Sequence, residues 1–169
     1  GAFEEASEVG RTQVRNGAHI LDVCLQDPDR EELIDMAEFL GFLTRKVKSP
    51  IMIDSTDHHV IEEALKMLQG KSIINSINLE DGEVRFAQVV PLAKRYGAAL
   101  VVGCIDDDPV QAQAITRDRK LEIAIRSHQL LTEKYGVPEE DIIFDGLVFP
   151  AGTGDQNYVG SAAETIEGI

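Results

Sequence analysis

The sequence predicts an α/β fold with a parallel sheet, and three observations support this prediction. Short apolar runs alternate with longer amphipathic stretches along the 169 residues. Glycine or proline stands between the helical stretches and the apolar runs that follow them, as expected at helix ends. Polar residues end the apolar runs. Strands separated by helices in this way form a parallel sheet with right-handed crossovers.

Five apolar runs are predicted to be strands. Each run is four to seven residues long and rich in β-branched or aliphatic side chains, as the buried strands of parallel sheets are. The runs are residues 19–24, 51–54, 72–75, 98–104 and 142–145.

Helical periodicity fills the intervals between the runs. The helical stretches are expected at residues 3–16, 33–47, 57–68, 83–96, 111–135 and 162–169. In stretch 111–135 a single apolar face is predicted. That face consists of Leu121, Ala124, Ile125, His128, Leu131 and Tyr135.

The ends of the predicted strands favour a closed barrel over an open sheet. No glycine fingerprint of a dinucleotide-binding fold follows the first run. In a (β/α)₈ barrel the carboxyl ends of all strands converge at one mouth, where the chemistry takes place. The polar residues in or just past the ends of the five runs are Asp22, Asp54, Asn75, Asp106 and Asp145.

A complete barrel of this type needs about 250 residues and eight strands. The chain is therefore predicted to be a single partial domain of the (β/α)₈ TIM-barrel type over residues 1–169, with about five strands and strands missing at both ends. A self-sufficient smaller sheet is the alternative. Because a partial barrel has two open edges with unpaired backbone groups, self-association is expected.

Composition and charge exclude several classes of partner. Sixteen basic against thirty acidic residues give a formal net charge of −14, which disfavours binding to nucleic acid and to anionic membranes. No apolar stretch approaches the roughly 18–20 residues of a membrane span. Cys24 and Cys104 are too few and too far apart for a disulfide scaffold or a zinc site, and they suit a cytoplasmic protein.

The polar strand ends permit three kinds of chemistry. The oxygens can ligate a divalent cation such as Mg²⁺, one carboxylate can act as a general base, or the carboxylates can accept hydrogen bonds from a donor-rich heterocycle such as a pterin. An aspartate after a strand can also simply cap the next helix. His58 and His59, at the start of stretch 57–68, are expected to be exposed and not to be metal ligands.

Five segments carry a family resemblance, in order and over essentially the whole chain. They are 16–23 (NGAHILDV), 50–55 (PIMIDS), 74–78 (INSIN), 95–102 (RYGAALVV) and 141–145 (DIIFD). Together they resemble successive signatures of the pterin-binding domain that is shared by cobalamin-dependent methionine synthases, corrinoid protein methyltransferases and, more distantly, dihydropteroate synthases.

The resemblance implies a (β/α)₈ barrel with reduced folate at its mouth, of which this chain spans the second to the sixth strand. It implies that Asp54 and Asp145 hold the amino-pyrimidine edge of the pterin. Asn75 would lie near the reacting N5 atom as the catalytic residue, and Asp22 and Asp106 would line the same mouth as substrate-binding residues.

The activity implied by the resemblance is transfer of the N5-methyl group of 5-methyltetrahydrofolate to Co(I) of a corrinoid. Cobalamin would be carried by another domain or protein, because the chain has no Asp-x-His-x-x-Gly motif. A Mg²⁺-dependent barrel lyase or phosphotransferase is one alternative, and a non-catalytic pterin-binding module is another. Two residues depart from the family pattern: Cys24 stands where many members have Asn, and Gly146 where many have Pro.

Overall fold

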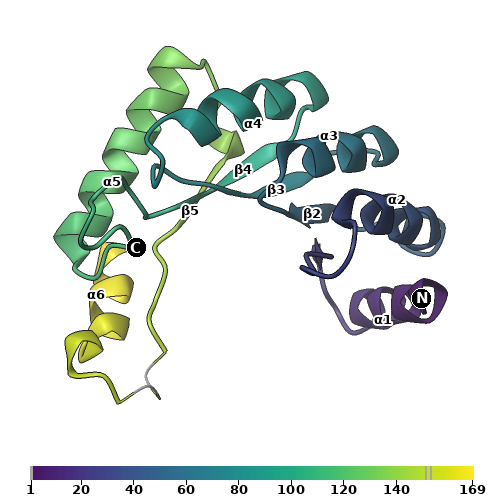
Figure 1. The fold of residues 1–169 in the computed structure, drawn as a ribbon, viewed down its shortest axis with the longest axis horizontal. Coiled ribbons are helices and arrows are strands. Elements are labelled where there is room, and N and C mark those ends of the chain that lie inside the picture. Colours follow the sequence, from purple (N-terminus) through teal and green to yellow (C-terminus); the bar gives the residue numbers. More distant parts are fainter. Residues whose placement is uncertain (1, 151, 153) are drawn as a thin grey trace. The chain divides into compact units, whose positions relative to one another are not determined.

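The computed structural model describes residues 2–150, 152 and 154–169, and in it helices and strands alternate along the chain (Figure 1). The strands are β1 (Leu21–Cys24), β2 (Ile51–Asp54), β3 (Ile73–Ile77), β4 (Ala99–Gly103) and β5 (Ile142–Asp145). The α-helices are α1 (Phe3–Arg15), α2 (Glu32–Leu43), α3 (His58–Met67), α4 (Val84–Tyr96), α5 (Arg117–Gln129) and α6 (Ser161–Gly168). A π-helical turn, Leu130–Lys134, continues α5. Each predicted strand is found, so the predicted βα alternation is confirmed.

The chain folds as two compact units. The first consists of the residues up to Ser76 together with Leu92–Ala99, and the second of Ile77–Pro91 together with the residues from Leu100 onward. Within each unit the neighbouring strands pair in parallel and follow the order of the chain.

In the first unit, strands β1 and β2 each have one buried and one accessible face. Leu21, Val23 and Ile53 are buried, whereas Asp22 and Asp54 on the opposite face are exposed or half-buried. This alternation follows from the two-residue period of a strand. The buried side chains pack where β1 contacts α1 and β2 contacts α3. The polar side chains are thereby left on the accessible face.

In the second unit, strand β4 is buried throughout and strand β5 is not. Ile143 and Phe144 of β5 are 42% and 41% exposed. The prediction that all five runs are buried strands is therefore wrong for β5, as it is for the accessible face of β1. Among the described residues β5 pairs only with β4, so it lies at an edge of the sheet, where its side chains lack the neighbours that a second flanking strand provides.

Helix α5 also differs from its prediction. It begins at Arg117 instead of residue 111, because the Thr116 side chain accepts the Arg119 N–H and caps the helix. Its buried face holds Lys120 and Ile123, whereas Leu121 and Ile125 of the predicted face are 39% and 57% exposed. The predicted face is therefore only partly wrong, since Leu131 is buried and Ala124 packs against the core. Lys120, with a complete set of acceptors, takes a core position that hydrophobicity alone does not predict.

The edge strands predict how the chain behaves by itself. We expect the isolated 169-residue chain to self-associate or aggregate at micromolar concentration, because β1 and β5 offer unpaired backbone groups to a neighbouring chain. Size-exclusion chromatography with light scattering measures this. Phe144→Lys, which puts a charge on the edge strand, should reduce the association. A parent chain that stays monomeric would contradict the prediction.

No helix in the described part of the chain has both the length and the apolar character needed to cross a bilayer.

Candidate functional site

Three of the predicted site residues come together on the accessible face of the first unit. Asp54 ends β2, and it is the direct register partner of Asn75 on β3. The Asn75 side-chain Nδ2 donates a hydrogen bond to Asp22 Oδ2 of β1 over 3.3 Å. Two carboxylates and one amide, contributed by three adjacent strands, therefore form one polar cluster.

Asp54 is the electrostatically unusual member of this cluster. Burial is the largest cause that raises the pKa of its carboxyl, and the negative charges of Asp22 and Glu32 raise it further. A carboxylate that lies among other acids is stabilised most by a partner that donates hydrogen bonds to it. The cluster thus favours a ligand edge with N–H groups over one with acceptors or negative charge.

Glu32 is a contributor that sequence reasoning missed. It begins α2, and its Oε1 atom is buried without a hydrogen-bond partner among the described residues. An acidic residue in the first turn of a helix is ordinarily interpreted as a partner of the helix dipole. The only signal in the sequence was its position directly after the loop that leaves β1.

The loops that leave β1 and β2 are tied to one another and to β3. Gln26 Nε2 donates to Thr56 Oγ1 over 2.9 Å, and this bond links the two loops. The N–H of the buried Ser55 donates to the Asn75 carbonyl over 3.2 Å, and its Oγ accepts from the Asp57 N–H over 3.1 Å. These bonds restrict the backbone on which Asp54 and Asn75 stand.

In the second unit, Asp145 ends β5 and is exposed. Its Oδ1 accepts a hydrogen bond from the Leu147 N–H over 2.8 Å. This bond engages one of the two carboxylate oxygens and orients the group.

Asp106 has a different environment from the one expected of a mouth residue. It is buried, its Oδ2 accepts from the Arg119 guanidinium, and its Oδ1 accepts from the Asp108 N–H over 3.2 Å. Both carboxylate oxygens therefore have protein partners, and contact with a ligand would require one of these bonds to open. Through these contacts Asp106 links the loop after β4 to helix α5. Its substrate-binding role stays a prediction.

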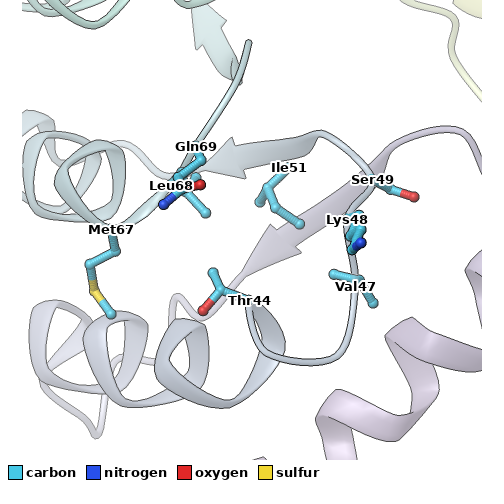
Figure 2. A pocket seen from close by; sticks show the side chains of 8 residues that line it. All are labelled: Thr44, Val47, Lys48, Ser49, Ile51, Met67, Leu68 and Gln69. Atoms are coloured by element: carbon cyan, nitrogen blue, oxygen red, sulfur yellow. The ribbon is translucent and has the colours of Figure 1, made fainter.

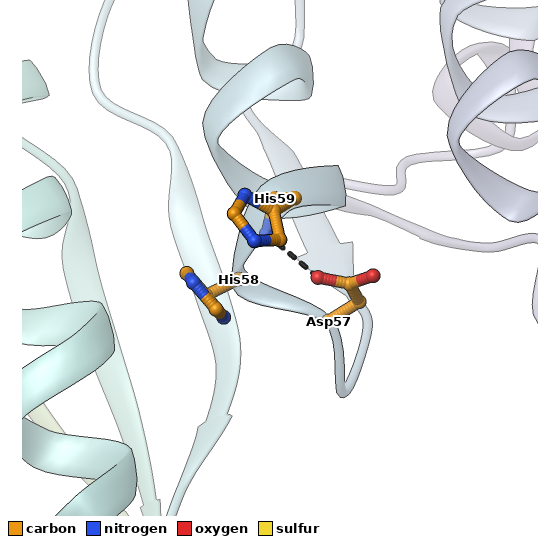
Figure 3. Close-up of side chains that lie close together, drawn as sticks. All are labelled: Asp57, His58 and His59. Atoms are coloured by element: carbon orange, nitrogen blue, oxygen red, sulfur yellow. Dashed lines mark hydrogen bonds between the residues drawn. The ribbon is translucent and has the colours of Figure 1, made fainter.

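One cluster in the described part of the chain has the composition of a metal site. Figure 3 shows Asp57, His58 and His59 at the start of α3, where one ligand atom of each lies within 4.8 Å of the others. The histidine pair was considered in the sequence without Asp57 as its third member. However, Asp57 Oδ1 accepts the His59 N–H over 2.8 Å as the helix cap, and the positive end of the helix dipole disfavours a cation there. We interpret the cluster as a capped helix start.

A cavity of about 450 Å³ lies at the other end of the strands in the first unit (Figure 2). Its side chains come from the end of α2, the following loop, the start of β2 and the end of α3. They are Thr44, Val47, Lys48, Ser49, Ile51, Met67, Leu68 and Gln69. Because chemistry in βα barrels takes place at the carboxyl ends of the strands, this cavity at an amino end is not the candidate site.

Comparisons with known proteins show the family to which the chain is similar. The family described as "Pterin binding enzyme" matches residues 1–165. The methionine synthase of Mycobacterium tuberculosis is 37% identical over 170 residues, and that of Mycobacterium leprae is 36% identical over 170 residues. Each match covers 99% of this chain and 14% of the relative, so the chain spans about one seventh of the length of these enzymes.

Solved structures of dihydropteroate synthases have a similar fold. That of Xanthomonas albilineans in complex with 7,8-dihydropteroate has a TM-score of 0.68 at 17% identity, over 99% of this chain and 57% of that one. That of Stenotrophomonas maltophilia has a TM-score of 0.67 at 20% identity, over 96% and 62% of the two chains.

These similarities confirm the predicted fold class, an α/β fold of five parallel strands alternating with helices that forms part of a TIM barrel. The family match over nearly the whole chain, together with its similarity to methionine synthases, confirms the resemblance found in the sequence. This chain belongs to the family of pterin-binding enzymes.

Proposed function

We propose that this chain binds 5-methyltetrahydrofolate and promotes transfer of its N5-methyl group to cob(I)alamin, which is held as the second substrate by another domain or protein. The identity of 36–37% to methionine synthases along 99% of the chain supports this reaction over others known for pterin-binding barrels. The observation that carries the proposal is the cluster of Asp22, Asp54 and Asn75 on three adjacent strands.

In this proposal the carboxylates recognise the pyrimidine edge of the pterin. That edge presents neighbouring N–H donors, and a carboxylate accepts two of them side by side, as it accepts two from arginine. Asp54 and Asp145 provide such acceptors at the ends of β2 and β5. Because the pKa of Asp54 is raised by burial and by neighbouring acids, hydrogen bonds from the pterin would relieve an unfavourable charge.

Asn75 assists the leaving group in the same proposal. A tertiary amine leaves poorly unless N5 is protonated as the N–CH₃ bond breaks. The methyl group moves to Co(I), which supplies the electron pair of the new bond, while N5 keeps the pair of the broken bond and carries a proton taken from water, so that tetrahydrofolate leaves with an N5–H. Asn75 Nδ2 donates to Asp22, so its Oδ1 is the atom that can accept the hydrogen of protonated N5.

The raised pKa of Asp54 predicts how folate affinity depends on pH. Above that pKa the group is a carboxylate and the affinity for folate is highest. As the pH falls through it, the acid form loses acceptor capacity and affinity falls. The Asp22→Asn variant lacks one negative neighbour that raises the pKa of Asp54. The pH at which half of the affinity is lost should therefore be lower in this variant. Calorimetric titration over a pH series measures both midpoints. Ionisation of the folate is common to both proteins, so an unchanged midpoint in the variant would contradict the prediction.

Calorimetry of the complete polypeptide with 5-methyltetrahydrofolate and, separately, with Mg²⁺ tests the binding half of the proposal. Saturable folate binding that does not require the metal is the expected result. Binding of Mg²⁺ without folate binding would instead favour a metal-dependent lyase or phosphotransferase. The structural similarity to dihydropteroate synthases makes dihydropteroate formation the second candidate reaction, and assaying that product in parallel separates the two.

A further inference from the structure

Lys120 of helix α5 is a buried lysine outside the polar clusters described above. It is 3% exposed, and its Nζ lies 2.8 Å from the Ala114 carbonyl oxygen, 2.6 Å from that of Gly146 and 3.0 Å from that of Leu147. An ammonium group has three N–H donors, and here each has a main-chain acceptor. Burial lowers the pKa of Lys120, and the three carbonyl dipoles compensate for the water that the ammonium has lost.

Two of these three acceptors belong to the loop that directly follows Asp145. Leu147 in this loop has φ of 54°, in the left-handed region that is unfavourable for residues other than glycine. The Thr165 Oγ1 of α6 lies 2.7 Å from the Leu147 carbonyl oxygen, closer than the 3.0 Å to the Ser161 carbonyl. Helices α5 and α6 therefore both donate to a loop residue whose backbone conformation is unfavourable for leucine.

The geometry of one peptide bond connects Lys120 to Asp145. The carbonyl of Gly146 and the N–H of Leu147 belong to the same planar unit, and in a trans peptide they point in opposite directions. When Lys120 holds the Gly146 oxygen, it also sets the direction of the Leu147 N–H. That N–H donates to Asp145 Oδ1 over 2.8 Å.

We propose that Lys120 is a positioning residue, which orients the Asp145 carboxylate for its ligand through the Gly146–Leu147 peptide. The ligand is the amino-pyrimidine edge of the pterin, so this part of the inference rests on the proposed function. Lys120 itself does not touch the substrate. Lys120 maintains the hydrogen bond from the Leu147 N–H to Asp145 Oδ1, so that the carboxylate faces the ring edge in a single orientation.

The test measures two quantities in the complete polypeptide carrying Lys120→Met, which keeps an unbranched apolar side chain one atom shorter than lysine and removes the three donors. Hydrogen–deuterium exchange of the Leu147 amide should accelerate by on the order of tenfold in the absence of folate. Binding of 5-methyltetrahydrofolate should weaken by roughly the same factor, with a much smaller change in the rate of methyl transfer at saturating folate.

Three further variants separate positioning from loss of stability. Lys134→Met, which removes a half-exposed lysine paired with Glu83, is the matched control and should change neither quantity. Thr165→Val removes the other donor to Leu147 and should shift both quantities in the same direction, and it provides the test if Lys120→Met does not fold. Leu147→Gly in the Lys120→Met background should restore part of the affinity, because glycine adopts the positive φ without strain.

Two outcomes would overturn the inference. One is a folded Lys120→Met variant with unchanged exchange at Leu147. The other is accelerated exchange with unchanged folate affinity in a protein whose parent binds folate. Failure of the parent to bind folate would instead refute the proposed function, and the exchange measurement would still test the link from Lys120 to Leu147.

Discussion

Replacing Asp54 or Asp145 with asparagine is expected to weaken binding of 5-methyltetrahydrofolate by about 2–4 kcal/mol in the complete polypeptide. The amide keeps the size of the side chain but replaces one acceptor with a donor, so that an N–H of the variant faces an N–H of the pterin. The loss of a charge-assisted pair adds to this mismatch. For Asp145, the Leu147 N–H can still be accepted by the amide oxygen, which preserves the loop.

Equilibrium titration with the folate measures this effect, and the thermal midpoint checks that each variant is folded. Asp118→Asn is the matched control, since that carboxylate lies on the exposed surface of α5 and pairs with Arg117. If both site variants bind folate as tightly as the parent does, the pterin is not held by these carboxylates.

Asn75→Ala is expected to slow methyl transfer to cob(I)alamin by more than tenfold, with a smaller loss in folate affinity. An interaction that strengthens as N5 becomes protonated acts mainly on the transition state, so that its removal lowers the rate more than the affinity. The hydrogen bond from Asn75 to Asp22 supports this role, because it sets which end of the amide is available to N5.

Stopped-flow transfer rates and equilibrium binding on the same variant test the role of Asn75. Asn16→Ala, at the exposed end of α1, is the control and should leave both values unchanged. Equal losses in rate and affinity would make Asn75 a binding residue. No loss in either would mean that Asn75 has only a structural role within strand β3.

The sequence predicted the strands better than the helices that carry buried polar groups. Strands β2 and β5 lie at the predicted residues 51–54 and 142–145, because the turn residues on either side of a short apolar run define where the strand begins and ends. Helix α5 was predicted to start six residues too early, and Leu121 and Ile125 of its predicted apolar face are exposed. Its buried face includes Lys120, and periodicity assigns a lysine to solvent unless its acceptors are known.

The candidate site was predictable to the extent that it follows from strand topology. Parallel strands bring their carboxyl ends to one edge, and Asp22, Asp54 and Asn75 do come together in the first unit. The burial of Asp106 against Arg119 and the contribution of Glu32 were not predictable. Both depend on how a helix packs against a loop, which no residue pattern within either segment specifies.

Single-turnover methyl transfer tests the central claim most directly. The complete polypeptide is mixed with 5-methyltetrahydrofolate and cob(I)alamin, and both products are quantified. The proposal predicts one methylated corrinoid and one tetrahydrofolate for each methyl donor consumed. A polypeptide that binds the folate but leaves cob(I)alamin unchanged would contradict the proposal and show that the chain serves as a pterin-binding module without turnover.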